Sequence, residues 1–242
     1  MPAAAWRLER LAPVPGAAVW PPKERAYGGE MPSLRRRYRD QLPVAGRLFL
    51  PVILLTVLLG ASFLYSDAVL LVPDAPGWLQ RGNLTMSDLI LPMGSITIYL
   101  TNRRYGPNYA FAQLLLGLCL LAAIVMADPY GVNDLVASTP VLSGRALMSF
   151  GIFFLLANFI GILVFEAVRG PEWWPPPLMG SFAVSLIFCL SYYPAVYAGH
   201  DANWAWTCVA HLAVFIGESL LLLFPDFLLR PAMRPLHGMN GY

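Results

Sequence analysis

The stretch YLTNRRYGPNY, residues 99–109, places two adjacent arginines between two apolar runs. The chain around it has 242 residues, is 57% hydrophobic and 12% charged, and carries a formal net charge of +2. This composition is typical of a membrane protein and excludes an ordinary soluble domain. The two arginines are therefore expected to lie in a loop at one membrane surface.

Apolar runs long enough to cross a bilayer recur along the chain. A hydrocarbon core of roughly 30 Å needs about 20 mostly apolar residues per helix. Six segments meet this requirement: about 48–68, 84–101, 109–127, 146–168, 178–198 and 204–229. We therefore predict an all-α integral membrane protein with six transmembrane helices. The second segment is the weakest, since it is short and contains Asp88 and Pro92, so five spans with a re-entrant second segment remain an alternative.

The lysines and arginines between these segments predict the orientation. With six spans, fourteen of them fall on the side of the N-terminus, against two on the other side, Arg81 and Arg145. Basic residues accumulate in cytoplasmic segments of membrane proteins. Both termini and the loop around residues 102–107 are therefore predicted to be cytoplasmic, in a bacterial-type inner membrane that the chain crosses several times.

Three regions follow from this pattern: a Pro/Arg-rich cytoplasmic arm at 1–47, a six-helix membrane domain at 48–229 and a cytoplasmic tail at 230–242. The arm contains LAPVPGAAVWPP, which is too rich in proline for a regular helix. It also contains the basic cluster SLRRRYRDQ, which is expected either to lie on anionic lipid headgroups or to dock on a partner protein. Met31 is an alternative start to Met1.

Polar residues deep inside the predicted spans are candidates for function, because ionisable groups in a bilayer are costly. Asn158 lies near the middle of the fourth span, and Glu218 lies near the middle of the sixth. His211 precedes Glu218 by two helical turns and shares its face. These three residues line a cavity, or else Asn158 and Glu218 join two helices through a hydrogen bond at equal depth. The other acidic residues of the spans lie near span ends, where water or headgroups reach them: Asp67, Asp88, Glu166 and Asp226.

No motif in the sequence indicates catalysis, a cofactor or nucleic-acid binding. The chain lacks HExxH, GxSxG and a phosphate-binding glycine loop, so we predict no enzymatic activity. His211 and Glu218 are about 10 Å apart along a helix, too far to bind one metal ion, and we predict no metal site. The expected partner is the lipid bilayer.

The opening stretch also carries a resemblance to a known family. LTNRRYGP resembles the signature D-L-V-N-R-R-Y-G of the vitamin-uptake-transporter-like (VUT) family, which includes queuosine precursor transporters. LMGSFAVSLIF is similar to the family's fifth-span motif, and FIGESLLLLFPDFLLR is similar to its last span. The resemblance covers about residues 48–236 and implies six spans with cytoplasmic termini. The matching residues of the loop are Asn102, Arg103, Arg104, Tyr105 and Gly106.

The chain departs from the family at several polar positions. Tyr99 replaces the acidic residue of the loop signature, and Leu186 and Cys189 replace the glutamine and aspartate of the fifth span. Val214 replaces a lysine of the last span, which leaves Glu218 as the matching polar residue. A pocket for a polar heterocycle must supply hydrogen-bond partners, so these losses weigh against the family's activity.

Two functions are therefore predicted as alternatives. The first is a divergent transporter of a small polar molecule, similar to a queuosine precursor, with Asn158, His211 and Glu218 lining its cavity. The second is a non-transporting accessory or structural subunit of a larger membrane complex, respiratory or photosynthetic, which docks through its arm and helix surfaces. Transport predicts a polar cavity open to water among the helices, whereas the subunit predicts a core that is packed shut.

Overall fold

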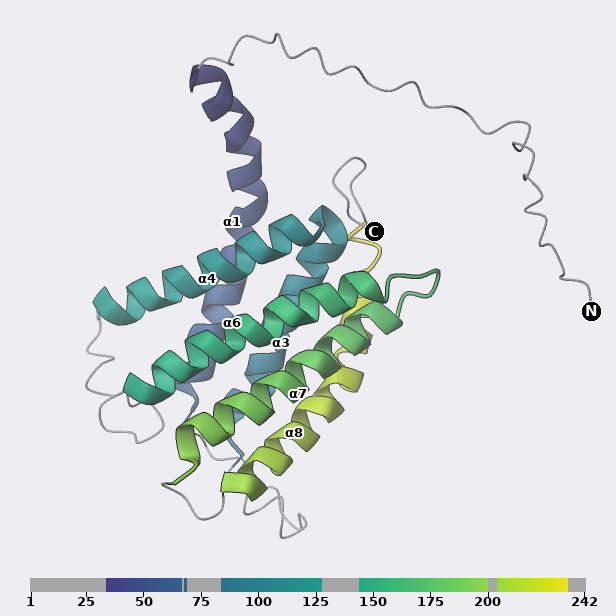
Figure 1. Ribbon diagram of the computed structural model, residues 1–242. Helices are drawn as coiled ribbons and strands as arrows, with labels where there is room; N and C mark the ends of the chain where they lie inside the picture. The colour runs from purple at the N-terminus through teal and green to yellow at the C-terminus, as the bar shows by residue number, and fades with distance from the viewer. Residues whose placement is uncertain (1–33, 67, 69–83, 128–143, 200–203, 235–242) are drawn as a thin grey trace, which may run out of the picture. The chain divides into compact units, whose positions relative to one another are not determined.

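The computed structural model describes residues 34–66, 68, 84–127, 144–199 and 204–234, and it confirms the all-α prediction (Figure 1). The helices of these residues are α1 (Leu34–Leu64), α3 (Met86–Tyr105), α4 (Pro107–Ala127), α6 (Gly144–Ala167), α7 (Pro175–Tyr197), α8 (Trp204–Leu221) and α9 (Leu223–Leu229). The chain divides into two compact units, Met1–Asp40 and Gln41–Tyr242, and the contacts given below lie within the second. The proline-rich part of the arm, the alternative start at Met31 and the last eight residues of the tail lie outside the described residues.

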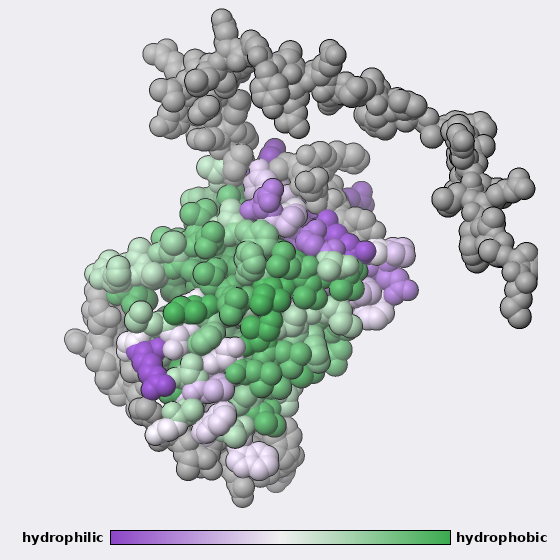
Figure 2. All heavy atoms as spheres, viewed as in Figure 1, coloured by the Kyte–Doolittle hydropathy of each residue, from purple (hydrophilic) through white to green (hydrophobic). Residues whose placement is uncertain are grey.

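Five helical segments are long and apolar enough to cross a membrane: Ala45–Leu64, Pro107–Ala127, Gly144–Ala167, Pro175–Tyr197 and Trp204–Leu229. Large apolar side chains cover their outer surfaces, with Leu50 70%, Met148 71% and Leu221 72% exposed. Figure 2 shows these residues as a broad hydrophobic belt. A soluble protein rarely exposes apolar surface on this scale, whereas lipid tails cover it readily. The chain is therefore a helical multi-pass membrane protein.

The second predicted span forms the 20-residue helix α3, which is not among the five apolar segments. Eleven of its residues are buried, and it contacts α4, α6, α7 and α8. Protein rather than lipid thus covers much of this helix, which explains how it accommodates Asp88, Pro92 and several hydroxyl groups. At 1.5 Å per residue, α3 is about 30 Å long, enough to match the thickness of a hydrocarbon core.

Two boundaries differ from the prediction for physical reasons. The first helix begins at Leu34 rather than near residue 48, so the end of the predicted arm is helical. The last predicted span is interrupted at Leu222, between α8 and α9. Pro225 lacks an N–H, and its ring crowds the carbonyl four residues earlier, at Leu221. The helical path therefore breaks there.

The prediction that Arg103, Arg104 and Tyr105 lie in a loop is wrong, because they form the last turn of α3 and, at the corner between the two helices, Gly106 alone separates it from α4. Gly106 has φ 87°, a conformation that residues with a Cβ rarely adopt, and its N–H donates to the carbonyl of Asn102 at 2.8 Å. Pro107 opens α4, where a missing N–H costs nothing. Glycine and proline in this motif are thus explained by the backbone of the corner.

Tyr99 fills a narrow space between α6 and α7. Its ring is 1% exposed and stacks on Phe165 with 5.4 Å between ring centroids. A Cβ on Gly161 would lie 2.5 Å from Tyr99 Oη, and a Cβ on Gly180 would lie 3.0 Å from Tyr99 Cζ. The two glycines therefore make room for the tyrosine ring.

Several arginines gather at the end of the bundle where α3 meets α4. Arg103 faces Asp226, and Arg104 Nη1 donates to the carbonyl of Ala232 at 2.7 Å. Figure 2 shows hydrophilic residues gathered at one end of the apolar belt. We call this the arginine-rich end; it comprises Arg103, Arg104, Arg169 and Arg230 with their partners Asn102, Trp173, Asp226 and Ala232.

Candidate functional site

A buried contact between a histidine and a carboxylate joins the first turn of α3 to α8. The Nε2 atom of His211 lies 3.3 Å from Oδ2 of Asp88, and the two residues are 5% and 6% exposed. The same oxygen accepts hydrogen bonds from the backbone N–H of Thr85 at 2.7 Å and from its hydroxyl at 3.1 Å. The ring of His211 packs edge-on against Tyr193, with centroids 4.4 Å apart. The second ring nitrogen of His211, Nδ1, is buried and has no hydrogen-bond partner among the described residues.

The prediction that Asp88 and Asp226 reach water or headgroups from span ends is wrong. Both side chains are buried, Asp88 beside His211 and Asp226 beside Arg103. A signal for the position of Asp88 was present: Thr85 and Asp88 have the spacing of a capping box before an apolar run, which predicts a side chain turned back onto its own helix.

The hydrogen bond predicted between Asn158 and Glu218 is not formed. Asn158 is fully buried, and its Nδ2 donates to the carbonyl of Phe154 in its own helix at 3.0 Å. Within the described part of the chain, Oδ1 of Asn158 and Oε2 of Glu218 are buried without a partner. Equal depth in the bilayer therefore did not place the two side chains against each other.

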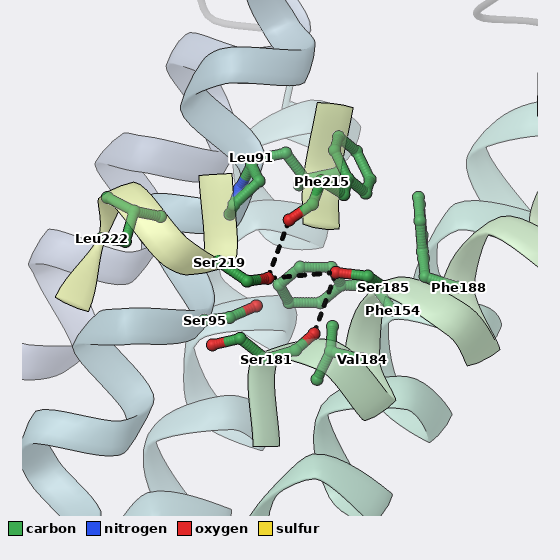
Figure 3. A pocket seen from close by; sticks show the side chains of 11 residues that line it. Leu91, Ser95, Phe154, Ser181, Val184, Ser185, Phe188, Phe215, Ser219 and Leu222 are labelled. Atoms are coloured by element: carbon green, nitrogen blue, oxygen red, sulfur yellow. Dashed lines mark hydrogen bonds between the residues drawn. The ribbon is translucent and has the colours of Figure 1, made fainter. Parts of the chain in front are cut away.

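A small cavity, lined by apolar side chains and four serines, lies among α3, α6, α7 and α8 (Figure 3). Hydroxyl groups contribute to its wall, and those of Ser185 and Ser219 lie 3.5 Å apart. Each also donates within its own helix, Ser185 to the carbonyl of Ser181 at 2.9 Å and Ser219 to that of Phe215 at 2.7 Å. The cavity volume is about 20 Å³, which is room for one water molecule. Asn158, His211 and Glu218, which were predicted to line a cavity, are not among its lining residues.

A second and larger pocket opens at the arginine-rich end, with a volume of about 230 Å³. Arg103 and Asp226 line it, with Nη1 and Oδ2 3.8 Å apart. Their side chains are 13% and 5% exposed. Arg230 lies over the ring of Trp173, 5.8 Å from its centroid, and both residues contribute to the wall.

Shared polar side chains connect the small cavity to the pocket at the arginine-rich end. Ser181 and Ser219 line both the small cavity and a narrow pocket that extends to Asp226, and Asp226 also lines the larger pocket. Ser219 follows His211 by eight residues on α8, and Asp226 lies on α9, beyond the break at Leu222. We define the polar seam as Asp88, Ser95 and Arg103 of α3, Ser181 and Ser185 of α7, and His211, Ser219 and Asp226 of α8 and α9.

Asn102, Arg104 and Tyr105 make contacts that hold the arginine-rich end together. Asn102 is fully buried, and its Oδ1 lies 3.5 Å from Nη2 of Arg169, which follows α6. The ring of Tyr105 packs against Tyr109 of α4, with centroids 5.4 Å apart. Arg104 reaches the segment after α9 through Ala232. The residues from Asn102 to Tyr105 thus contact the segment after α6, helix α4 and the segment after α9. Arg103 among them lines the larger pocket.

Among the described residues, no group of three His, Cys, Asp or Glu side chains could hold a metal ion. No protein-family model, curated protein or solved structure matches the chain.

Proposed function

We propose that the protein transports a small polar solute across the membrane and that the polar seam is its route. The observation that carries this proposal is the series of shared pocket walls from the small cavity at Ser185 and Ser219 to the Arg103–Asp226 pair. The buried Asp88–His211 pair lies on two of the same helices, α3 and α8. Unpaired buried polar groups cost about 1–3 kcal/mol each. Nδ1 of His211, Nε of Arg103 and Oδ2 of Asp226 are such groups among the described residues, and a polar solute on this route would supply their missing partners.

The resemblance to the VUT family supports the same proposal and suggests the solute class, a polar heterocycle similar to a queuosine precursor. Asn158, His211 and Glu218 remain candidates for contact with the solute, and Asp88 joins them through its pair with His211. We assign the chain to a bacterial-type inner membrane with both termini in the cytoplasm, on the strength of its arginine distribution. The proposal includes no catalytic reaction.

The small cavity implies that the route is closed in this conformation. A space of about 20 Å³ holds one water molecule and no heterocycle. Transport of a larger solute therefore requires α3 to move relative to α7 and α8, as in transporters that open alternately to either side.

A second candidate function is an accessory subunit of a larger membrane complex. The observation that favours it is the same small cavity, because a packed core is what a non-transporting scaffold requires. Co-purification distinguishes the two functions, because a subunit should purify together with other membrane proteins after extraction in a mild detergent. Deleting residues 2–30 should then reduce that association while the helices remain inserted.

The transport proposal is tested by uptake of a radiolabelled queuosine precursor into liposomes that contain the purified protein. We expect uptake above that of empty liposomes and a clear loss in Asp88→Asn, which keeps the shape of a side chain in the polar seam. Glu166→Gln is the matched control, since Glu166 pairs with Arg169 outside the polar seam. Absence of uptake by a folded wild-type protein that purifies with partner proteins would favour the accessory function.

A further inference from the structure

The pocket at the arginine-rich end has the size of a small polar group. Its volume of about 230 Å³ lies below the roughly 300–1,000 Å³ that drug-sized ligands occupy. It is bounded by the end of α3, the segment that precedes α7, and α9, where the apolar belt gives way to charged residues. Such a position corresponds to the depth of lipid headgroups.

The charges around this pocket balance. Arg103 and Arg230 supply two positive charges, and Asp226 and Glu172 supply two negative charges. A lone anion would be attracted by the arginines and repelled by the carboxylates, and a lone cation would meet the reverse. A ligand that carries both signs can place each charge beside its opposite.

Two buried atoms of this wall retain unused hydrogen-bonding capacity. Within the described residues, Nε of Arg103 has no acceptor and Oδ2 of Asp226 has no donor. The closest approach of the two side chains is 3.8 Å, which is an ion pair but too long for a hydrogen bond. A ligand with an anionic acceptor and an adjacent donor would satisfy both atoms, and their burial strengthens such bonds.

Aromatic packing fixes the second arginine of the pocket. Trp173 packs against Phe227 with ring centroids 5.3 Å apart, and Arg230 lies over the same tryptophan. A guanidinium held over an aromatic face loses less conformational entropy when it binds an anion. Arg103 and Arg230 therefore offer a preformed anion site beside Asp226.

We propose that this pocket binds a zwitterion made of a phosphodiester next to a primary ammonium group. The phosphate oxygens accept from Arg103 Nε and from Arg230, and the ammonium donates to Asp226 Oδ2 and to Glu172. This chemistry has two sources, the headgroup of phosphatidylethanolamine and free glycerophosphoethanolamine. The site shares Arg103 and Asp226 with the polar seam, but it requires no movement of solute through that seam.

The experiment is native mass spectrometry of the full-length protein, equilibrated in detergent with equal amounts of phosphatidylethanolamine, phosphatidylcholine and phosphatidylglycerol. We expect one phosphatidylethanolamine to stay bound to each protein, with a preference of about tenfold over each of the other two lipids. The quaternary ammonium of phosphatidylcholine cannot donate a hydrogen bond, and phosphatidylglycerol has no cation. Asp226→Asn and Glu172→Gln should remove the preference. Arg234→Gln should preserve it, because Arg234 is exposed and does not line the pocket.

Glu172 is exposed, so its substitution keeps the test valid even where Asp226→Asn fails to fold. A second arm adds millimolar glycerophosphoethanolamine to lipid-depleted protein and measures the midpoint of thermal unfolding. A rise that Glu172→Gln abolishes identifies the free compound as a ligand, and retention of the lipid without such a rise identifies the headgroup. Equal retention of the three lipids by the wild type, together with no thermal shift, would overturn the proposal, as would an unchanged preference in a folded Glu172→Gln protein.

Discussion

Replacing Gly161 by alanine should destabilise the bundle through a collision with Tyr99. The added Cβ would lie 2.5 Å from Tyr99 Oη and 2.5 Å from Cγ2 of Val184. Carbon atoms pack at about 3.5–4.0 Å, so neighbouring side chains must shift, and overpacking of this kind costs about 1–3 kcal/mol. Since each kcal/mol corresponds to roughly 2–4 °C for a chain of this size, we expect the unfolding midpoint in detergent to fall by about 2–12 °C.

The matched control is Gly151→Ala in the same helix. No atom lies within 4 Å of a Cβ built on Gly151, so this variant should gain helix propensity without a collision. Tyr99→Phe tests the cause, because it removes the hydroxyl that the new methyl group meets. That hydroxyl is buried without a partner among the described residues, so Tyr99→Phe alone should raise the unfolding midpoint.

The double variant Gly161→Ala/Tyr99→Phe should recover part of the loss, measured as a coupling in a double-mutant cycle. Recovery is expected to be incomplete, since the contact with Val184 remains. The reasoning is refuted if Gly161→Ala and Gly151→Ala unfold at the same temperature, or if Tyr99→Phe leaves the deficit of Gly161→Ala unchanged.

Three further predictions concern the corner, the capped helix and the orientation. Gly106→Ala should lower the free energy of unfolding by about 1–2 kcal/mol, because its φ of 87° is unfavourable for alanine; an unchanged midpoint of thermal unfolding would contradict this. Asp88→Ala should cost about 0.5–2 kcal/mol through loss of the cap, and Asp88→Asn should cost less, as compared by thermal unfolding; equal losses would argue against the capping role. Single cysteines at 103–107 and 231–242 should resist an impermeant reagent in intact cells, and those at 129–140 should react; external labelling at 103–107 would reverse the assigned orientation.

Hydropathy predicted the helices well because it is a local property. The runs at 109–127 and 146–168 became helices at Pro107–Ala127 and Gly144–Ala167, within two residues at each end. The run at 84–101 was the weakest candidate for a span, and the structure gives the reason: neighbouring helices cover much of α3.

The contacts of polar side chains were less predictable, because depth along a helix does not determine which direction a residue faces. Asn158 and Glu218 have matching depths, yet Asn158 bonds to its own helix. Arg103 and Asp226 lie far apart in sequence, and their pairing depends on how α9 continues after the break at Leu222. Tertiary packing fixes such directions, and a single sequence gives no direct measure of it.

The burial of α3 by later helices has a consequence for how the chain enters the membrane. A segment that is not apolar enough to partition into lipid by itself must wait for protein surfaces that accept its polar face. Two of the helices that α3 contacts, α7 and α8, follow it by more than sixty residues. During synthesis α3 therefore depends on helices that have not yet been made, and a nascent chain that stops after α4 should be retained by the insertion machinery or degraded.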